Sequence, residues 1–182
     1  LAAGCTCILK PAEQTPLTAL RLGELIIEAG FPPGVVNILT GMGETAGAAL
    51  VAHPGVDKIA FTGSTPVGKL INKSATDTLK RVSLELGGKS PVLIFPDADV
   101  NAAIGGASNA IFFNHGQVCC AGSRLYAHRS VFDQVVEGIS GAAKSIKLGP
   151  GLDPQTQMGP LVSKEQQDRV LGYIESGKKQ GA

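Results

Sequence analysis

Two adjacent thiols lie in the polar segment Phe112-Phe113-Asn114-His115-Gly116-Gln117-Val118-Cys119-Cys120-Ala121-Gly122-Ser123-Arg124. The segment follows a long run of small residues, which predicts a helix. A thiol is a useful nucleophile only as the thiolate, and a free cysteine with a pKa of about 8.5 is mostly protonated at neutral pH. Backbone N–H groups aimed at the sulfur, or a nearby positive charge, would favour the thiolate. Because adjacent cysteines also occur as small buried hydrophobic residues, this segment alone fits either a catalytic or a packing role.

A carboxylate upstream favours the catalytic interpretation. Glu85 closes an apolar run in Leu84-Glu85-Leu86-Gly87-Gly88-Lys89-Ser90-Pro91, which predicts a strand that ends in a turn. Open α/β sheets place functional side chains at such strand ends. Together, the motifs Glu-Leu-Gly-Gly-Lys-Ser-Pro and Phe-x-x-x-Gly-Gln-x-Cys resemble the two active-site signatures of the NAD(P)-dependent aldehyde dehydrogenase superfamily. The resemblance extends along essentially all 182 residues. It is closest to bacterial members that act on aromatic or arylacetic aldehydes such as phenylacetaldehyde.

The composition indicates a globular α/β protein. Hydrophobic residues make up 43% of the chain and charged residues 17%, a balance typical of a packed interior rather than of disorder. The net charge is +1 and no Lys/Arg cluster alternates with aromatic residues, so nucleic acid is not an expected partner. The four cysteines, at positions 5, 7, 119 and 120, have no histidine at metal-ligand spacing. We therefore expect no metal site and a reduced, cytoplasmic protein. No apolar run approaches the roughly 18 residues that would span a membrane.

Strand and helix patterns alternate along the first half of the chain. Strands are predicted at 4–10, 35–39, 58–62 and 81–86, with helices capped by Thr15, starting near Glu44 and following Gly63-Ser64. Such alternation predicts a parallel sheet covered on both faces. After Gly87-Gly88 the pattern predicts strands at 91–95 and 124–128, helices capped by Asp99, Ser130 and Ser163, and an irregular crossing at 148–160.

The resemblance assigns each of these two halves to a domain of the superfamily. It implies an α/β fold in which residues 1–87 are the C-terminal part of an NAD-binding domain with a partial Rossmann-like parallel sheet. Residues 88–182 would then be the N-terminal part of an α/β, aldehyde dehydrogenase-like catalytic domain that bears the nucleophile. Members of the superfamily are much longer than this chain. We therefore expect an internal fragment that is inactive alone, within a parent protein that forms a homo-oligomer.

The resemblance also assigns roles to individual residues. Cys119 would attack the aldehyde, its backbone N–H would stabilise the oxyanion, and Glu85 would be the general base that activates water. Val118 and Cys120 would line the substrate pocket. The implied cofactor-binding residues are Lys10, Glu13, Gly63, Ser64, Val67, Leu86 and Gly87.

The pattern around the cofactor is less specific than the catalytic motifs. Gly-Ser-Thr-x-x-Gly at Gly63 fits a pyrophosphate site, but an ordinary capped helix start has the same pattern. The common G-x-G-x-x-G fingerprint is absent, as in the superfamily's variant of the fold. By resemblance, Lys10 and Glu13 bind the adenosine ribose. A carboxylate accepts from both ribose hydroxyls and would repel a 2′-phosphate, so Glu13 favours NAD over NADP.

Several neighbouring residues are expected to be structural. Cys5 and Cys7 are predicted to pack in the core, as are Phe112 and Phe113. His115 could be mistaken for a base that activates Cys119. A lone histidine in a loop-like segment is more commonly solvated, and we expect that here.

Three other functions stay open on the sequence. An acylating relative would pass the thioester to coenzyme A, but such enzymes do not typically need the glutamate found at Glu85. A cysteine hydrolase needs a partner histidine, and none of the three histidines lies in a recognisable partner motif. A non-enzymatic nucleotide-binding or structural fragment is the third.

Overall fold

The structure, a computed structural model, describes residues 1–181. The chain divides into two compact units, an N-terminal unit over Leu1–Leu86 and a C-terminal unit over Gly87–Ala182.

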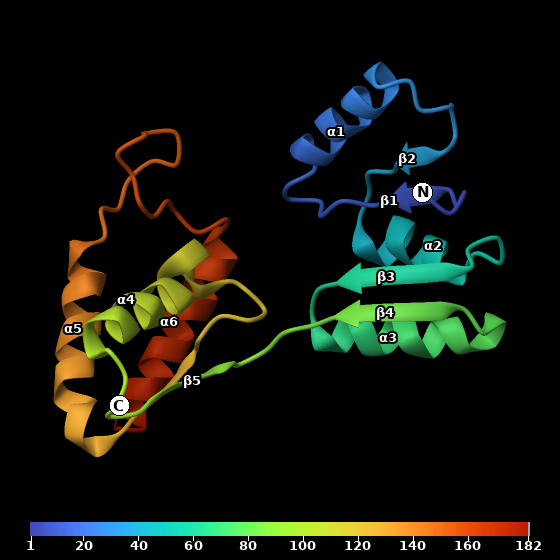
Figure 1. The fold of residues 1–182 in the computed structure, drawn as a ribbon. Helices are drawn as coiled ribbons and strands as arrows, with labels where there is room; N and C mark the ends of the chain where they lie inside the picture. Colours follow the sequence, from blue (N-terminus) through green and yellow to red (C-terminus); the bar gives the residue numbers. More distant parts are fainter. Residues whose placement is uncertain (182) are drawn as a thin grey trace. The chain divides into compact units, whose positions relative to one another are not determined.

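The N-terminal unit is built from strands that alternate with helices (Figure 1). All of its strands run in the same direction, and β1 pairs in parallel with β2 and β3 with β4. Its carboxyl strand ends therefore lie on one side of the unit. In chain order the elements are β1 (Cys7–Leu9), α1 (Leu17–Glu28), β2 (Val36–Ile38), a π-helical turn (Gly43–Gly47), α2 (Ala48–Ala52), β3 (Lys58–Thr62), α3 (Thr65–Ala75), a 3-10 turn (Thr76–Thr78) and β4 (Arg81–Glu85).

The predicted parallel pairing is confirmed, but the prediction of a sheet covered on both faces is wrong. The described strands of this unit form two pairs rather than one continuous sheet. In β3 and β4, side chains such as Phe61 and Leu84 are half-buried while their neighbours Ala60 and Ser83 are exposed. The helix α3 packs against β4, and the alternate residues of β3 and β4, on the opposite face from Phe61 and Leu84, are exposed. The expected burial of Cys5 and Cys7 is also wrong, because Cys7, the first residue of β1, and Cys5 just before it are both exposed in the described chain.

Two helix starts in this unit differ in their chemistry. The Ser64 hydroxyl accepts a hydrogen bond from the Val67 N–H at 3.4 Å and caps α3. The predicted Thr15 cap of α1 is wrong, because Pro16 occupies the cap position and no side chain caps the helix. Gly68 is buried, and a Cβ there would lie 2.7 Å from Leu86 Cδ2. The missing side chain lets α3 approach the chain just after β4.

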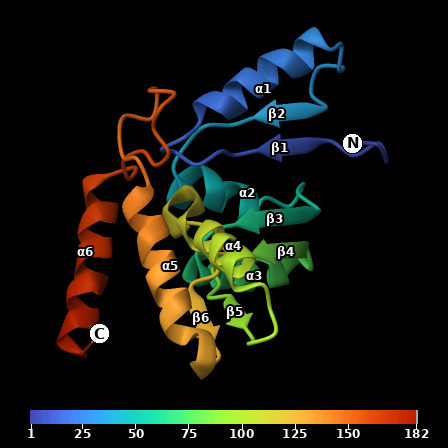
Figure 2. The same cartoon turned by 60° about the vertical axis from the view of Figure 1, so that its left-hand side comes forward.

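The C-terminal unit packs helices around one parallel strand pair, β5 with β6. Its core contains Ile94, Ala107 and Val135, the last fully buried, with α4 packed against α5 (Figure 2). A Cβ on Gly138 would lie 2.5 Å from Ile104 Cδ1, which shows how closely the two helices approach. The elements are β5 (Pro91–Ile94), α4 (Val100–Phe112), a 3-10 turn (Phe113–Gly116), β6 (Arg124–Ala127), a 3-10 turn (Arg129–Val131), α5 (Phe132–Ser145) and α6 (Lys164–Lys179).

Two of the three caps predicted for this unit are confirmed. Asp99 Oδ1 accepts from the Ala102 N–H at 3.1 Å, and Ser163 Oγ accepts from the Gln166 N–H at 3.2 Å. The Ser130 cap is wrong, since a 3-10 turn precedes α5 and His128 Nδ1 accepts from the Ser130 N–H. None of the described helices combines the length and apolar character needed to cross a bilayer.

Candidate active site

The predicted nucleophile lies at the centre of a tight turn. The Ala121 N–H donates to the Val118 carbonyl at 3.0 Å, so Cys119 and Cys120 occupy the two middle positions of a four-residue turn. Both cysteines are exposed and neither is in a disulfide, while Val118 is half-buried. Among the described residues, the Cys119 N–H donates no hydrogen bond. The turn therefore presents a thiol and a free backbone donor from the same residue.

Close backbone packing supports this turn on both sides. The Gly122 N–H donates to the Ala110 carbonyl at 3.0 Å, and a Cβ on Gly122 would lie 2.6 Å from Val92 Cγ2. A Cβ on Gly88 would overlap the Cys119 carbonyl oxygen. The missing side chains let β5, the end of α4 and the Gly-Gly segment all contact the turn.

The aromatic residues before the turn behave differently from one another. Phe112 is half-buried at the end of α4. Phe113 is 66% exposed, so its predicted role in the core is wrong. It lies beyond the last helical turn, where the chain changes direction and no described element covers it.

His115 also departs from expectation. It is half-buried, and its Nε2 is 2.7 Å from the Gly159 carbonyl oxygen. The prediction of a solvated side chain is wrong, because the ring bonds to Gly159 instead. Gly159 lies 44 positions further along the chain. A contact at that separation leaves no local pattern in the sequence.

The predicted general base ends strand β4. The Glu85 side chain is exposed, and its backbone carbonyl accepts from the Gly63 N–H at 3.0 Å. Glu85 also pairs in register with Thr62, the last residue of β3. The structure thus brings together Gly63 and Glu85, which the sequence assigned to the cofactor and to the chemistry. Glu85 belongs to the N-terminal unit and Cys119 to the C-terminal unit.

Lys10 and Glu13 form an ion pair after β1. Lys10 Nζ is 3.4 Å from Glu13 Oε2 and also donates to the carbonyls of Pro11 and Gly41, at 2.8 and 3.0 Å. The pKa of the Glu13 carboxyl is lowered from 4.5, first by a hydrogen bond from its own backbone N–H and then by the charge of Lys10. Glu13 is therefore an ionised, exposed acceptor at neutral pH.

The residues after β3 have roles in the fold that do not depend on a bound cofactor. A Cβ on Gly63 would overlap the Phe61 ring, so any larger residue there would displace this ring even without a ligand. Ser64 caps α3, as the simpler interpretation of this pattern predicted. Val67 is exposed in the first turn of α3, whose N–H groups could bind an anion. Further along, the Leu86 side chain packs near Gly68, and a Cβ on Gly87 would contact nothing within 4 Å.

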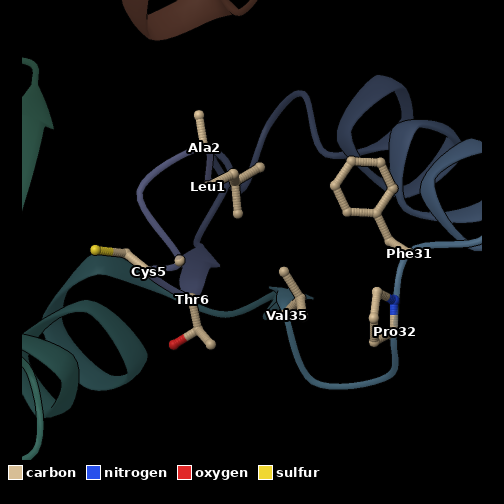
Figure 3. A pocket seen from close by; sticks show the side chains of 8 residues that line it. Leu1, Ala2, Cys5, Thr6, Phe31, Pro32 and Val35 are labelled. Atoms are coloured by element: carbon tan, nitrogen blue, oxygen red, sulfur yellow. The ribbon is translucent and has the colours of Figure 1, made fainter.

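A hollow elsewhere in the N-terminal unit contains none of the predicted site residues. Figure 3 shows the side chains that line it, and its volume is about 520 Å³. Its lining is mostly apolar and is made by Leu1, Ala2, Gly4, Cys5, Thr6, Phe31, Pro32 and Val35. Among the residues the structure describes, no cluster of His, Cys, Asp or Glu could hold a metal ion.

Sequence reasoning did not single out Gly88, Gly159 or Gln166. Gly88 packs on Cys119, and the adjacent Gly-Gly pair was the only signal for it. Gln166 Nε2 donates to Gln117 Oε1 at 3.2 Å from 49 positions away. That contact and the Gly159 acceptor arise from the tertiary fold, so no sequence motif reports them.

Comparison with known proteins identifies the family of this chain. The family model described as "Aldehyde dehydrogenase family" matches residues 1–182. The chain belongs to the aldehyde dehydrogenase family. It is 59% identical, over all of its length, to a putative aldehyde dehydrogenase DhaS of Bacillus subtilis (strain 168). It is 56% identical to a phenylacetaldehyde dehydrogenase of Pseudomonas fluorescens. These matches cover 37% and 36% of the two relatives.

Solved structures confirm the fold. An aldehyde dehydrogenase from Bacillus cereus, in a complex with NAD+, is 56% identical and superposes with a TM-score of 0.97. The match covers 99% of this chain and 37% of that one. The chain therefore has the α/β fold of the family and spans about a third of the length of its relatives.

Proposed function

We propose that the full-length protein containing this chain oxidises an aldehyde to a carboxylic acid and reduces NAD. The observation that carries the proposal is the turn at Val118–Ala121, which exposes the Cys119 thiol beside a free Cys119 N–H. Membership of the family and similarity to a structure solved with NAD+ support the class of reaction.

Cys119 and Glu85 divide the chemistry between them. The Cys119 thiolate attacks the aldehyde carbon, and its N–H donates to the oxygen that becomes negative. Loss of hydride from that carbon leaves a thioester on Sγ. Glu85 then takes a proton from water, the water oxygen adds to the thioester carbon, and the C–S bond breaks. The carboxylic acid leaves and the thiolate is regenerated.

The N-terminal unit fits a nicotinamide dinucleotide, which accepts the hydride when bound. The α3 N-terminus at Gly63, Ser64 and Val67 supplies N–H groups suited to a pyrophosphate. Lys10 and the ionised Glu13 suit the ribose hydroxyls, and the negative charge of Glu13 favours NAD over NADP. Leu86 and Gly87 complete the proposed set. Residues 1–87 would then be part of the NAD-binding domain and residues 88–182 part of the catalytic domain.

The substrate we propose is an aromatic or arylacetic aldehyde. A relative named phenylacetaldehyde dehydrogenase is 56% identical to the chain and supports this choice. Val118 and Cys120 flank the nucleophile and would line the aldehyde pocket. We also propose that the full-length protein is a cytoplasmic homo-oligomer.

The test is to follow NADH formation by the full-length protein with phenylacetaldehyde and with a short aliphatic aldehyde. Cys119→Ser should abolish NADH formation, because a hydroxyl provides far less anion than a thiol at neutral pH. Cys120→Ser is the matched control and should affect mainly the KM for the aldehyde. An acyl adduct found on Cys120 by mass spectrometry would contradict the assignment.

Glu85→Gln separates the two half-reactions. It should release about one NADH per subunit in a burst and then stall, since losing a general base typically costs about 10²–10⁴-fold on its step. If the burst itself disappears, Glu85 is not limited to thioester hydrolysis.

A further inference from the structure

The nucleophile turn follows an uncommon run of backbone conformations. Asn114, His115 and Gly116 have φ values of 49°, 61° and 72°, all in the left-handed region. Glycine adopts that region easily, whereas other residues occupy it uncommonly, although asparagine and histidine do so more often than most. The contacts that hold Asn114 and His115 therefore determine how the chain enters the turn at Val118.

Asn114 is held by local bonds. Its Nδ2 donates to the Gln117 carbonyl at 3.2 Å, and its own carbonyl accepts from the Gln117 N–H at 3.0 Å. These bonds close a small ring within the segment. They do not join the segment to the rest of the C-terminal unit.

His115 supplies one such connection, next to the bond from Gln166 Nε2 to Gln117 Oε1. Its Nε2 lies 2.7 Å from the Gly159 carbonyl oxygen. A carbonyl oxygen only accepts, so Nε2 carries the hydrogen. The Nδ1 atom is buried and has no hydrogen-bond partner among the described residues. The ring therefore makes no polar contact with Cys119 within the described chain, which argues against a role as its base.

The acceptor belongs to a well-connected loop. The Gln157 N–H donates to the Lys147 carbonyl at 2.9 Å, and the Lys147 N–H donates to Gln157 Oε1 at 2.8 Å. The Gly149 N–H also donates to the Met158 carbonyl at 3.3 Å. Gly159 directly follows this hydrogen-bonded loop. The bonds of the loop therefore hold the Gly159 carbonyl in place.

We propose that His115 is a positioning residue that fixes the Cys119 turn through its hydrogen bond to the Gly159 carbonyl. The role in catalysis rests on the proposed function, whereas the effect on the order of the turn does not. One measurement is therefore needed for each.

A pair of amide variants isolates the hydrogen bond. The amide nitrogen of glutamine is as many bonds from Cα as Nε2 of histidine, so His115→Gln can keep the donor. His115→Asn is one methylene shorter and loses the reach, but asparagine tolerates positive φ better than glutamine. If backbone strain alone mattered, the asparagine variant would be the better ordered. A positioning hydrogen bond predicts the opposite ranking.

The first measurement is hydrogen–deuterium exchange of the full-length protein. In the peptide that contains Gln117–Gly122, His115→Asn should raise the exchange rate about tenfold. His115→Gln should stay within about twofold of the parent. His128→Ala, which removes an exposed histidine of the same unit, is the control and should leave this peptide unchanged. Equal exchange in the parent and in His115→Asn would overturn the proposal.

The second measurement is the rate constant of the NADH burst. His115→Asn should lower it about tenfold, with burst amplitude and KM for NAD unchanged, and His115→Gln should restore it. Loss of amplitude at an unchanged rate would mean a merely structural role and would overturn the proposal. If the parent forms no NADH with any aldehyde, the proposed function fails, and exchange alone then decides the role of His115.

Discussion

The Glu13 carboxylate stays ionised throughout the neutral range because its pKa is lowered from 4.5. Its backbone hydrogen bond and the charge of Lys10 both favour the anion. A lowered pKa in the folded protein contributes stability above the ordinary pKa, and this contribution is lost as the pH falls through the lowered value. Any effect of this charge on cofactor choice should therefore be independent of pH between about 6 and 9.

Glu13→Gln should weaken the preference for NAD. The neutral amide still bonds to ribose hydroxyls but no longer repels a 2′-phosphate, so the ratio of kcat/KM for NAD to that for NADP should fall about tenfold. Glu24→Gln makes the same charge change on an exposed part of α1 and is the control. Equal efficiency with both cofactors in the unmodified protein would contradict the role of Glu13.

Residue roles were predictable from the sequence where the partner is close along the chain. The caps Ser64, Asp99 and Ser163 each bond to an N–H three positions later, so a short pattern reveals them. His115 could not be predicted in this way, because its acceptor comes from a distant loop.

At the level of elements, the candidate site residues lie at the ends of three strands, β1, β3 and β4, and in one turn at Val118–Ala121. The strand β3 was predicted with its observed bounds, 58–62, since Ile59 and Phe61 alternate with smaller or polar residues and Gly63 follows the strand. The start of α5 was not, because the 3-10 turn before it uses a histidine ring nitrogen in place of the expected serine cap. Helix ends of this kind depend on local geometry that residue preferences do not specify.

Gly88→Ala tests how the turn is supported. A Cβ at this position overlaps the Cys119 carbonyl oxygen, and backbone cannot move aside as a flexible side chain can. We expect a loss of about 1–3 kcal/mol in the free energy of unfolding and a lower thermal midpoint in the full-length protein. The NADH burst should also slow.

Gly105→Ala is the matched substitution with the opposite expected sign. Gly105 lies inside α4, and a Cβ there would meet nothing within 4 Å. Replacing glycine within a helix should stabilise the protein by about 0.5–1 kcal/mol. If both variants shift the thermal midpoint in the same direction, the close packing of Gly88 against Cys119 is not what holds the turn in place.

The whole described chain exposes far more surface than a compact protein of its mass. Its accessible area is 13221 Å² for 18.6 kDa. A folded monomer of that mass should expose about 8,200 Å², and two separate units of half the mass about 9,900 Å² together. Many large hydrophobic side chains contribute to this surface. Leu152 is 100% exposed, Leu79 89% and Tyr173 77%, while only six hydrophobic residues among those described are buried.

This surface also explains why the sequence predicted a sheet covered on both faces. Apolar residues alternate in the strands as they do in a sheet with a buried side, but a pattern shows that a face is apolar and does not say what covers it. Spanning 37% of the length of its relatives, the chain lacks elements that those relatives have. The sequence of this segment therefore does not show which elements cover the apolar faces of its strands.

Expressed by itself, the chain should therefore bind a hydrophobic dye strongly and aggregate, because many large hydrophobic side chains are exposed and few are buried. The full-length protein at equal molar concentration is the control and should bind little dye. Thermal unfolding of the isolated chain should be broad, since two small units with few buried hydrophobic residues bury too little area for a sharp cooperative transition. Size-exclusion chromatography with light scattering gives the complementary measurement. A monodisperse monomer with a sharp melt and little dye binding would mean that the exposed faces need no partner, and the expectation of a dependent fragment would be wrong.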